Sequence, residues 1–136
     1  MPKFSTKSLD RLATCHQDLQ TLFNEVIKHF DCTILEGYRN QEDQDRAYRD
    51  GKSKLRFPDG KHNKMPSNAV DVLPYPVPAW KNTVDFIYFG GQVMGIAAML
   101  FYQGKITSKI RYGGDWSQDD LVSNDKFGDF VHFEIC

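Results

Sequence analysis

Apolar side chains recur at every third or fourth position across residues 17–30, with polar residues between them. This spacing collects the apolar residues on one face of an α-helix, so the segment is predicted to be an amphipathic helix. A shorter helical turn is expected before it, around residues 8–13. Asn40 with Asp43 three positions later is typical of a helix N-cap, and Gly51 has the place of a C-terminal glycine. These two signals bound a further predicted helix.

Short apolar runs with turn residues at their ends favour β-strands over helices. Four such runs occur, at residues 32–39, 68–73, 109–114 and 130–135. Between the second and the third lies an uncharged stretch, residues 86–102, in which Gln92 and three glycines interrupt the apolar pattern. A helix that crosses a membrane needs about 20 apolar residues, so a core helix that ends near Gly104 is the better interpretation.

The predicted order of elements is α-α-β-α-β-α-β-β. This order favours an α+β fold, with a small, mostly antiparallel sheet and helices packed on one side. The chain has 136 residues, which fits a single domain over residues 1–136 with its own hydrophobic core. No internal repeat, linker or low-complexity segment interrupts the sequence.

Charge and cysteine content narrow the function classes. With 17 basic and 18 acidic residues the net charge is −1, and no basic stripe is present, which argues against nucleic-acid binding. Three cysteines without a C-x-x-C pair fit a reducing cytoplasm better than a disulfide framework. Residues 1–20 lack the apolar segment of a secretory signal peptide. We therefore expect a cytoplasmic location and no membrane insertion. We also expect a monomer, although neither the charge nor the cysteines determine the oligomeric state.

One carboxylate lies in the middle of a predicted buried strand. In "AVDVL", Val70 and Val72 share one face and Asp71 points to the other, because successive strand residues alternate. The same alternation in "FVHFEI" puts His132 on the face opposite the apolar residues. Two neighbouring strands of this kind would bring Asp71 and His132 together. His62, on the long loop that precedes the first of them, could then close over both.

Two imidazoles and one carboxylate match the protein ligands of a catalytic zinc ion, which keeps its fourth position for water. Such a cation would explain how Asp71 tolerates its apolar neighbours, since an unpaired buried charge is costly. The residues alone leave a second interpretation open. In it, Asp71 is a paired core carboxylate and His132 is a strand histidine bonded to a backbone carbonyl.

Three motifs follow one another along the chain: His62, then "NAVD" with Asp71, then "DFVH" with Asp129 and His132. They resemble the signature of the zinc D-Ala-D-Ala metallopeptidases. The segments "EGYRNQEDQDRAYRDGKS", "VLPYP", "RYGGDW" and "HFEI" resemble the short phage members of that family, the L-alanyl-D-glutamate endopeptidases. Together these pieces span residues 30–136, which is most of the chain.

The resemblance implies a zinc cofactor and assigns roles to single residues. His62, Asp71 and His132 would be the zinc ligands, and Asp129 would be the catalytic base that takes a proton from water. Arg39 would hold the substrate or stabilise the oxyanion. The side chains expected to line the substrate groove are those of Gln44, Tyr48, Ser53 and Trp116.

The identity of the base has an alternative. Asp129 and His132 are three positions apart, and a regular strand would aim them at opposite faces. A bend or bulge at Gly128 would bring them to the same side. Without such a bend, Glu134 is the candidate base, because it lies two positions after His132 on the same face.

The activity that the resemblance implies is hydrolysis of the L-Ala–D-Glu bond in the peptidoglycan stem peptide, as in a phage endolysin. The alternatives are a D-Ala-D-Ala carboxypeptidase or dipeptidase, and a catalytically inactive module that binds the cell wall. A phage enzyme of this kind would accumulate in the cytoplasm of the bacterial host. It would reach its expected partner, peptidoglycan, through a lesion made by a holin.

Overall fold

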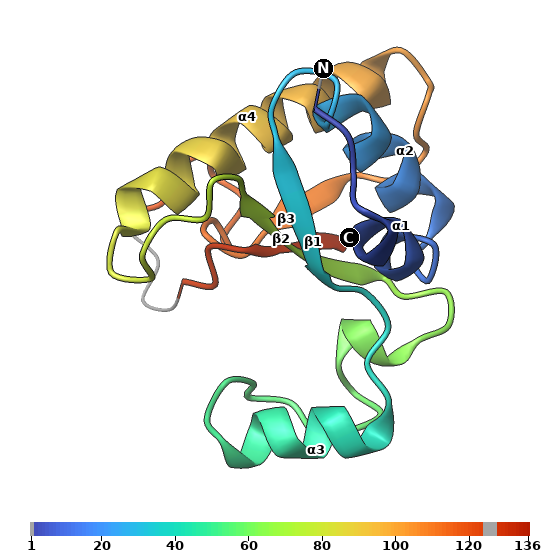
Figure 1. Cartoon of the computed structure of the whole chain (residues 1–136), viewed down its shortest axis with the longest axis vertical. Coiled ribbons are helices and arrows are strands. Elements are labelled where there is room, and N and C mark those ends of the chain that lie inside the picture. The colour runs from blue at the N-terminus through green and yellow to red at the C-terminus, as the bar shows by residue number, and fades with distance from the viewer. Residues whose placement is uncertain (1, 124–127) are drawn as a thin grey trace.

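The computed structural model describes residues 2–123 and 128–136, and its elements follow the predicted order (Figure 1). Four strands form one antiparallel sheet in the order β1-β2-β4-β3. With four α-helices and one 3₁₀ helix in the described residues, the protein has the α+β fold that the sequence predicts. The elements are α1 (Thr6–Leu12), α2 (Gln17–Val26), β1 (Cys32–Glu36), α3 (Gln41–Arg49), η1 (Lys61–Asn63), β2 (Ala69–Pro74), α4 (Thr83–Tyr102), β3 (Ile110–Tyr112) and β4 (His132–Ile135).

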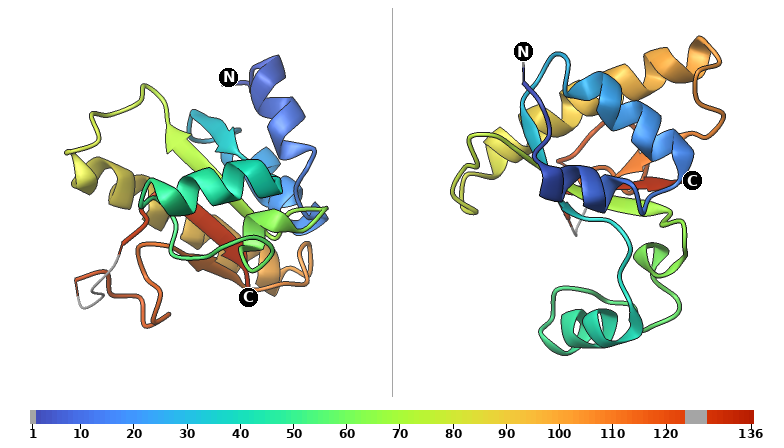
Figure 2. Two further views of the ribbon diagram at one scale, coloured as in Figure 1. Left: turned by 90° about the horizontal axis from the view of Figure 1, so that it is seen from below. Right: turned by 45° about the vertical axis from the view of Figure 1, so that its right-hand side comes forward.

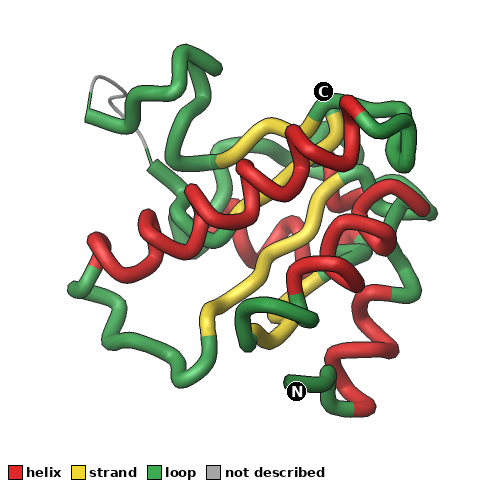
Figure 3. The backbone as a smooth tube through the Cα atoms, turned by 90° about the horizontal axis from the view of Figure 1, so that it is seen from above, coloured by secondary structure: helices red, strands yellow, loops and turns green. Residues whose placement is uncertain are grey.

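The hydrophobic core lies between the sheet and the two long helices, α2 and α4 (Figure 3). Phe133 at the centre of β4 is fully buried. Its ring lies 5.4 Å from that of Phe23, 6.5 Å from that of Phe89 and 5.0 Å from that of Tyr112, centroid to centroid. Burial of large apolar side chains is the dominant favourable term in folding, so this aromatic group holds both helices on the sheet.

Helix α4 is the core helix that the sequence predicts for residues 86–102. It buries Phe89, Val93, Ala97 and Leu100 in the main core. Among the described residues, α4 is also the one helix long and apolar enough to cross a membrane. Here its buried face packs against α2, β2 and β3 instead.

Helix α1 covers the outer edge of the sheet. Strand β1 is an edge strand, so the backbone of Ile34 has no strand partner on its outer side. Ser8 Oγ accepts a hydrogen bond from the Ile34 amide at 3.0 Å, and Arg11 Nη1 donates to the Ile34 carbonyl at 3.0 Å. Two side chains of α1 thus replace a neighbouring strand at this point.

Helix α3 stands on the opposite side of the sheet from α4 (Figure 2, left). It begins as predicted, since Asn40 Oδ1 accepts a hydrogen bond from the Asp43 amide at 2.9 Å, and Gly51 follows it with a φ of +77°. Gln44 is its one buried residue. Because α3 has no apolar face to bury, it stays off the core, and with the loop after it forms an arm beside the sheet.

Several element boundaries differ from the sequence prediction. Strand β1 ends at Glu36, before residue 39, and β3 covers Ile110–Tyr112 instead of residues 109–114. Two further differences have a visible cause. Helix α2 ends at Val26 instead of residue 30, because the chain tightens into turns in which the amides of His29 and Phe30 both donate to the Val26 carbonyl. Strand β4 begins at His132 instead of residue 130. Before it, the His132 amide donates to the Asp129 carbonyl at 3.2 Å and closes a turn.

Candidate metal centre

Asp71 and His132 face each other across two neighbouring strands. They are direct partners in the antiparallel pairing of β2 with β4, and the next pair, Val70 with Phe133, points into the core. Side chains at directly opposed positions share a face. His132 Nδ1 therefore lies 3.2 Å from Asp71 Oδ1, on the face of the sheet away from α2 and α4.

His62 reaches the same point from outside the sheet. It lies in the 3₁₀ helix η1, and its Nε2 is 3.2 Å from Asp71 Oδ1. Its Nδ1 donates to the Gly37 carbonyl at 2.7 Å, since a carbonyl can only accept. That bond leaves the lone pair of Nε2 directed at Asp71. The long loop that precedes β2 carries this histidine, as the sequence predicts.

The three side chains can hold one metal ion. One potential ligand atom from each of His62, Asp71 and His132 lies within 4.8 Å of the others, and all three residues are buried. Two imidazole nitrogens and one carboxylate oxygen suit a transition metal such as zinc better than calcium or magnesium, which prefer oxygen ligands. With three protein ligands the site would leave a coordination position for a solvent molecule.

The charges around the cluster favour a cation. Burial raises the pKa of Asp71, but His62 and His132 outweigh that effect and bring the pKa below its usual value. Burial lowers the pKa of His132, yet hydrogen bonds from its ring to Asp71 and Glu134 raise that pKa to about 10. A positive charge is therefore stabilised at this point, and a metal ion would compete with protons for it.

Asp129 lies beside the cluster, on the side of His132 that faces Asp71. Its Oδ2 is 3.9 Å from His132 Nδ1. The turn that precedes β4 produces this arrangement, so the bend that the sequence requires at this point is present. Burial and the charge of Asp71 raise the pKa of Asp129 above its usual value. A carboxylate with a raised pKa, next to a potential ligand position, is suited to accept a proton.

Gly113 permits the close approach that this turn needs. Its carbonyl accepts from the Asp129 amide at 2.8 Å, and its amide donates to the His132 carbonyl at 2.7 Å. A Cβ atom at Gly113 would lie 2.1 Å from the Asp129 carbonyl oxygen. Only glycine leaves room here, so the end of β3 fixes where the Asp129 turn lies.

Glu134 contacts the opposite end of the His132 ring. Its Oε1 is 2.8 Å from His132 Nε2, and its Oε2 accepts from Arg111 Nη2 at 2.7 Å. Burial raises the pKa of Glu134, but His132 and Arg111 outweigh it and lower the pKa to about 2. Of the two carboxylates considered as a base, Asp129 is therefore the one that faces the cluster.

Arg39 lies at the edge of the cluster with its guanidinium held in place. Its Nη2 is 3.8 Å from Asp71 Oδ2, while Glu36 binds it through both carboxylate oxygens, at 2.6 and 3.2 Å. Its Nη1 donates to Gln44 Oε1 at 2.9 Å. Burial lowers the pKa of Arg39, but the Glu36 carboxylate outweighs it, so the side chain stays cationic.

Gln44 and Ser53 build the connection between the arm and the sheet. Gln44 is 1% exposed, and its Nε2 donates to Ser53 Oγ at 2.9 Å and to the Leu55 carbonyl. Its Oε1 also accepts from Asn63 Nδ2 at 3.2 Å, one residue after His62. Gln44 therefore fixes the arm relative to Arg39 and to the turn that carries His62.

The two aromatic candidates lie apart from each other. Trp116 lies with its ring 5.4 Å from that of His132, centroid to centroid, and the Arg111 guanidinium is 5.2 Å from the centre of the Trp116 ring. Tyr48 is on α3, partly exposed, under the guanidinium of Arg56. Trp116 is thus the one of the two that flanks the potential metal ligands.

Sequence reasoning missed several residues that organise the cluster, namely Glu36, Lys61, Asn63 and Arg111. A signal was available for one of them. In "KIRY", Arg111 stands between two apolar residues, and strand alternation puts it on the polar face. Nothing in the sequence indicates that it pairs with Glu134, because that pairing depends on the register of β3 and β4.

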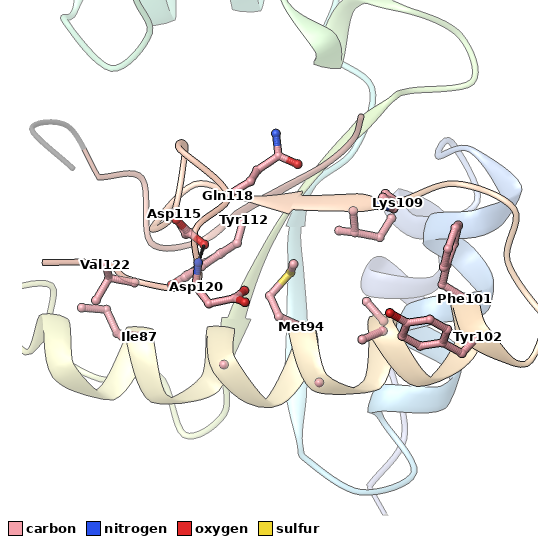
Figure 4. Close-up of a pocket in the computed structure, with 15 residues that line it drawn as sticks. Ile87, Met94, Phe101, Tyr102, Lys109, Tyr112, Asp115, Gln118, Asp120 and Val122 are labelled. Atoms are coloured by element: carbon pink, nitrogen blue, oxygen red, sulfur yellow. Dashed lines mark hydrogen bonds between the residues drawn. The ribbon is translucent and has the colours of Figure 1, made fainter. Parts of the chain in front are cut away.

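A sizeable cavity lies away from this cluster in the part of the chain that the structure describes. It has a volume of about 730 Å³ and lies between α4 and the chain at and after β3, with Met94 pointing from the helix toward the strand (Figure 4). None of the three potential ligands, nor Asp129 or Arg39, lines it. Its lining is mostly apolar, so this cavity is separate from the cluster of polar side chains around Asp71.

Comparisons with known proteins concern the fold and the family of this chain. A crystal structure of the L-Ala D-Glu endopeptidase ChiX of Serratia marcescens is similar with a TM-score of 0.71 and 20% sequence identity, over 98% of this chain and 90% of that one, which shows a shared fold. A search of curated protein sequences finds no match. The family model for phage L-alanyl-D-glutamate peptidases matches residues 1–136. The chain therefore belongs to the phage L-alanyl-D-glutamate peptidase family.

Proposed function

We propose that this protein is a zinc-dependent peptidoglycan endopeptidase that hydrolyses the L-Ala–D-Glu bond of the stem peptide. The observation that carries the proposal is the convergence of His62 Nε2, Asp71 Oδ1 and His132 Nδ1, from two strands and a loop, on one buried point. Family membership supports the choice of bond.

His62, Asp71 and His132 would hold the zinc ion. When bound, zinc would supply Lewis-acid chemistry by polarising the scissile carbonyl and lowering the pKa of water. Asp129 accepts the proton of the attacking water and passes it to the leaving amine, for which its raised pKa is suited. Arg39, fixed by Glu36, faces the developing negative charge on the carbonyl oxygen.

We propose that the substrate contacts two regions around the three proposed ligands: Trp116 on one side, and the arm formed by α3 and the loop after it on the other. Trp116 offers a flat apolar surface next to His132, against which a peptide stem can pack. The arm contributes Ser53 and Tyr48, while the buried Gln44 acts by holding Arg39 and Ser53 in place.

Metal analysis beside peptide hydrolysis tests the proposal. The wild-type protein should bind one zinc per chain and cleave defined muropeptides with release of a new D-Glu amine. Chelator should abolish hydrolysis, and the His132→Ala variant should lose both zinc and activity. Release of D-Ala instead would identify a carboxypeptidase or dipeptidase. Binding to sacculi without hydrolysis, unchanged by chelator, would identify an inactive wall-binding module.

We also propose that the protein accumulates in the cytoplasm of the bacterial host and reaches the wall by holin-type release. Cys15 and Cys32 are buried and free, which fits a reducing compartment. Expression in a bacterial host without a holin should leave cells intact, and co-expression of a holin should lyse them. Lysis without a holin would contradict this route.

A further inference from the structure

We propose that Glu134 is a positioning residue for the metal centre, which fixes the tautomer of His132 and ties together both segments that supply histidine ligands. This inference rests on the proposed zinc function, but it concerns a residue outside the ligand set. It also replaces the alternative in which Glu134 is the catalytic base.

The contact with His132 sets which ring nitrogen carries a proton. Glu134 Oε1 lies 2.8 Å from His132 Nε2, and an ionised carboxylate can only accept a hydrogen bond. Nε2 must therefore carry the hydrogen, and Nδ1 is the nitrogen whose lone pair can bind a cation. A carboxylate behind a ligating imidazole also orients the ring and makes it a stronger ligand.

Glu134 is itself held by two cations from separate elements. Arg111 on β3, its direct partner in the sheet, donates to Oε2 through Nη2 at 2.7 Å and through Nε at 3.2 Å. Lys61 Nζ is 3.3 Å from the same oxygen and donates to the carbonyl of Ile135. Although Glu134 is 4% exposed, these partners compensate its charge, so it remains an ionised acceptor.

Lys61 extends the effect of Glu134 to the second histidine. It immediately precedes His62 in η1, so its bond to Glu134 connects the turn that carries His62 with the strand that carries His132. Lys61 reinforces this connection, because its carbonyl accepts from the Asn68 amide just before β2. Glu134 is thus the point at which β3, β4 and η1 meet.

Zinc affinity, measured by competition with a chelator at neutral pH, tests this role. Glu134→Ala should bind zinc about 10- to 100-fold more weakly than wild type, the range typical for loss of a partner behind a metal ligand. Glu134→Gln should lose less, because its amide oxygen can still accept from Nε2. Long-range ¹H–¹⁵N spectra of the zinc-loaded wild type should show His132 protonated at Nε2 alone.

A matched control separates positioning from stability. Asp18→Asn removes another buried carboxylate, one that bonds Thr107 and Ser108 far from the cluster. It should lower the thermal midpoint of the metal-free protein and leave zinc affinity within twofold of wild type. If Glu134 has a purely structural role, Glu134→Ala should also lower the thermal midpoint and leave zinc affinity within twofold of wild type. That result would overturn the proposal.

The remaining outcomes are also decisive. If Glu134→Ala does not fold, Glu134→Gln and Arg111→Gln take its place, and unchanged zinc affinity in both overturns the inference. At saturating zinc, Glu134→Ala should keep far more kcat than Asp129→Ala; an equal loss would restore Glu134 as the base. Failure of the wild type to bind zinc would refute the proposed function itself, which is a different result from unchanged affinity in the variants.

Discussion

The two faces of the β2–β4 strand pair have different roles: one packs in the hydrophobic core and the other carries the polar cluster. Val70 and Phe133 are cross-strand partners on the face covered by α2 and α4, and both are fully buried. Asp71 and His132 form the adjacent pair and point to the other face. A shift of one residue therefore separates apolar packing from polar chemistry, since side chains alternate along a strand.

Burial alone does not define the hydrophobic core of this protein. Asp71 and His132 are 7% and 8% exposed, nearly as hidden as their apolar neighbours. Polar partners compensate their burial: His62 Nδ1 donates to the Gly37 carbonyl, His132 Nε2 contacts Glu134, and Asp71 Oδ2 lies 3.8 Å from Arg39 Nη2. A buried polar network is stable only when it is satisfied in this way.

The largest effect is expected at the polar face, from Asp129→Ala. Removal of a positioned base should lower kcat about 10²- to 10⁴-fold. Zinc content should stay at the wild-type value, because Asp129 is not one of the three proposed ligands. Steady-state hydrolysis of muropeptides with metal analysis of the same sample measures both. An active Asp129→Ala beside a dead Glu134→Ala would show that the base had been assigned to the wrong residue.

The apolar face should respond to Phe133→Ala with a loss of stability. Truncation of a fully buried phenylalanine typically costs about 3 to 5 kcal/mol of unfolding free energy. Because Phe133 contacts rings from α2, α4 and β3, the cavity would be large. Urea unfolding of the chelator-treated protein gives the value, and His132→Ala is the matched variant from the other face. A smaller loss for Phe133→Ala than for His132→Ala would contradict the division between the faces.

The smallest effect should come from a carboxylate on the helical side, Asp18. Its Oδ2 accepts from the amides of Thr107 and Ser108 at 3.2 and 3.0 Å. Burial raises the pKa of Asp18, but these hydrogen bonds, Ser108 first, outweigh it and lower the pKa. A lowered folded-state pKa means that the contribution to stability is present above the unfolded-state pKa, near 3.9, and is lost as the pH falls below it.

Asp18→Asn should therefore be less stable than wild type by about 1.5 to 3 kcal/mol at pH 7, the range of hydrogen bonds to a charged group. The difference should close as the pH is lowered through 4 toward 2. Thermal or urea unfolding across that pH series measures it in the metal-free protein. A difference that is constant with pH would mean that the Asp18 charge does not contribute.

Strand alternation was enough to predict that Asp71 and His132 share the polar face. The sequence could not show that they are direct partners, because the register depends on how β2 and β4 pack under Phe133. The position of Asp129 beside the cluster could not be predicted from the sequence either. It follows from a turn closed by backbone hydrogen bonds, with Gly113 from another strand lying against it.

The start and end of helix α3 could be predicted, because both depend on residues at the helix ends. The cap at Asn40 and the glycine at Gly51 bound α3 as expected. Where α3 lies could not be read from them. Its position depends on Gln44, whose partners Arg39, Ser53 and Asn63 are distributed over 25 residues of chain, from 39 to 63.

The way α1 covers β1 has a consequence for self-association. An incoming strand from a second molecule would have to displace Ser8 and Arg11 from the backbone of Ile34 before it could extend the sheet. Growth by strand addition is blocked at that border. Any intermolecular β-pairing by this fold would have to begin at the other border, along the short strand β3.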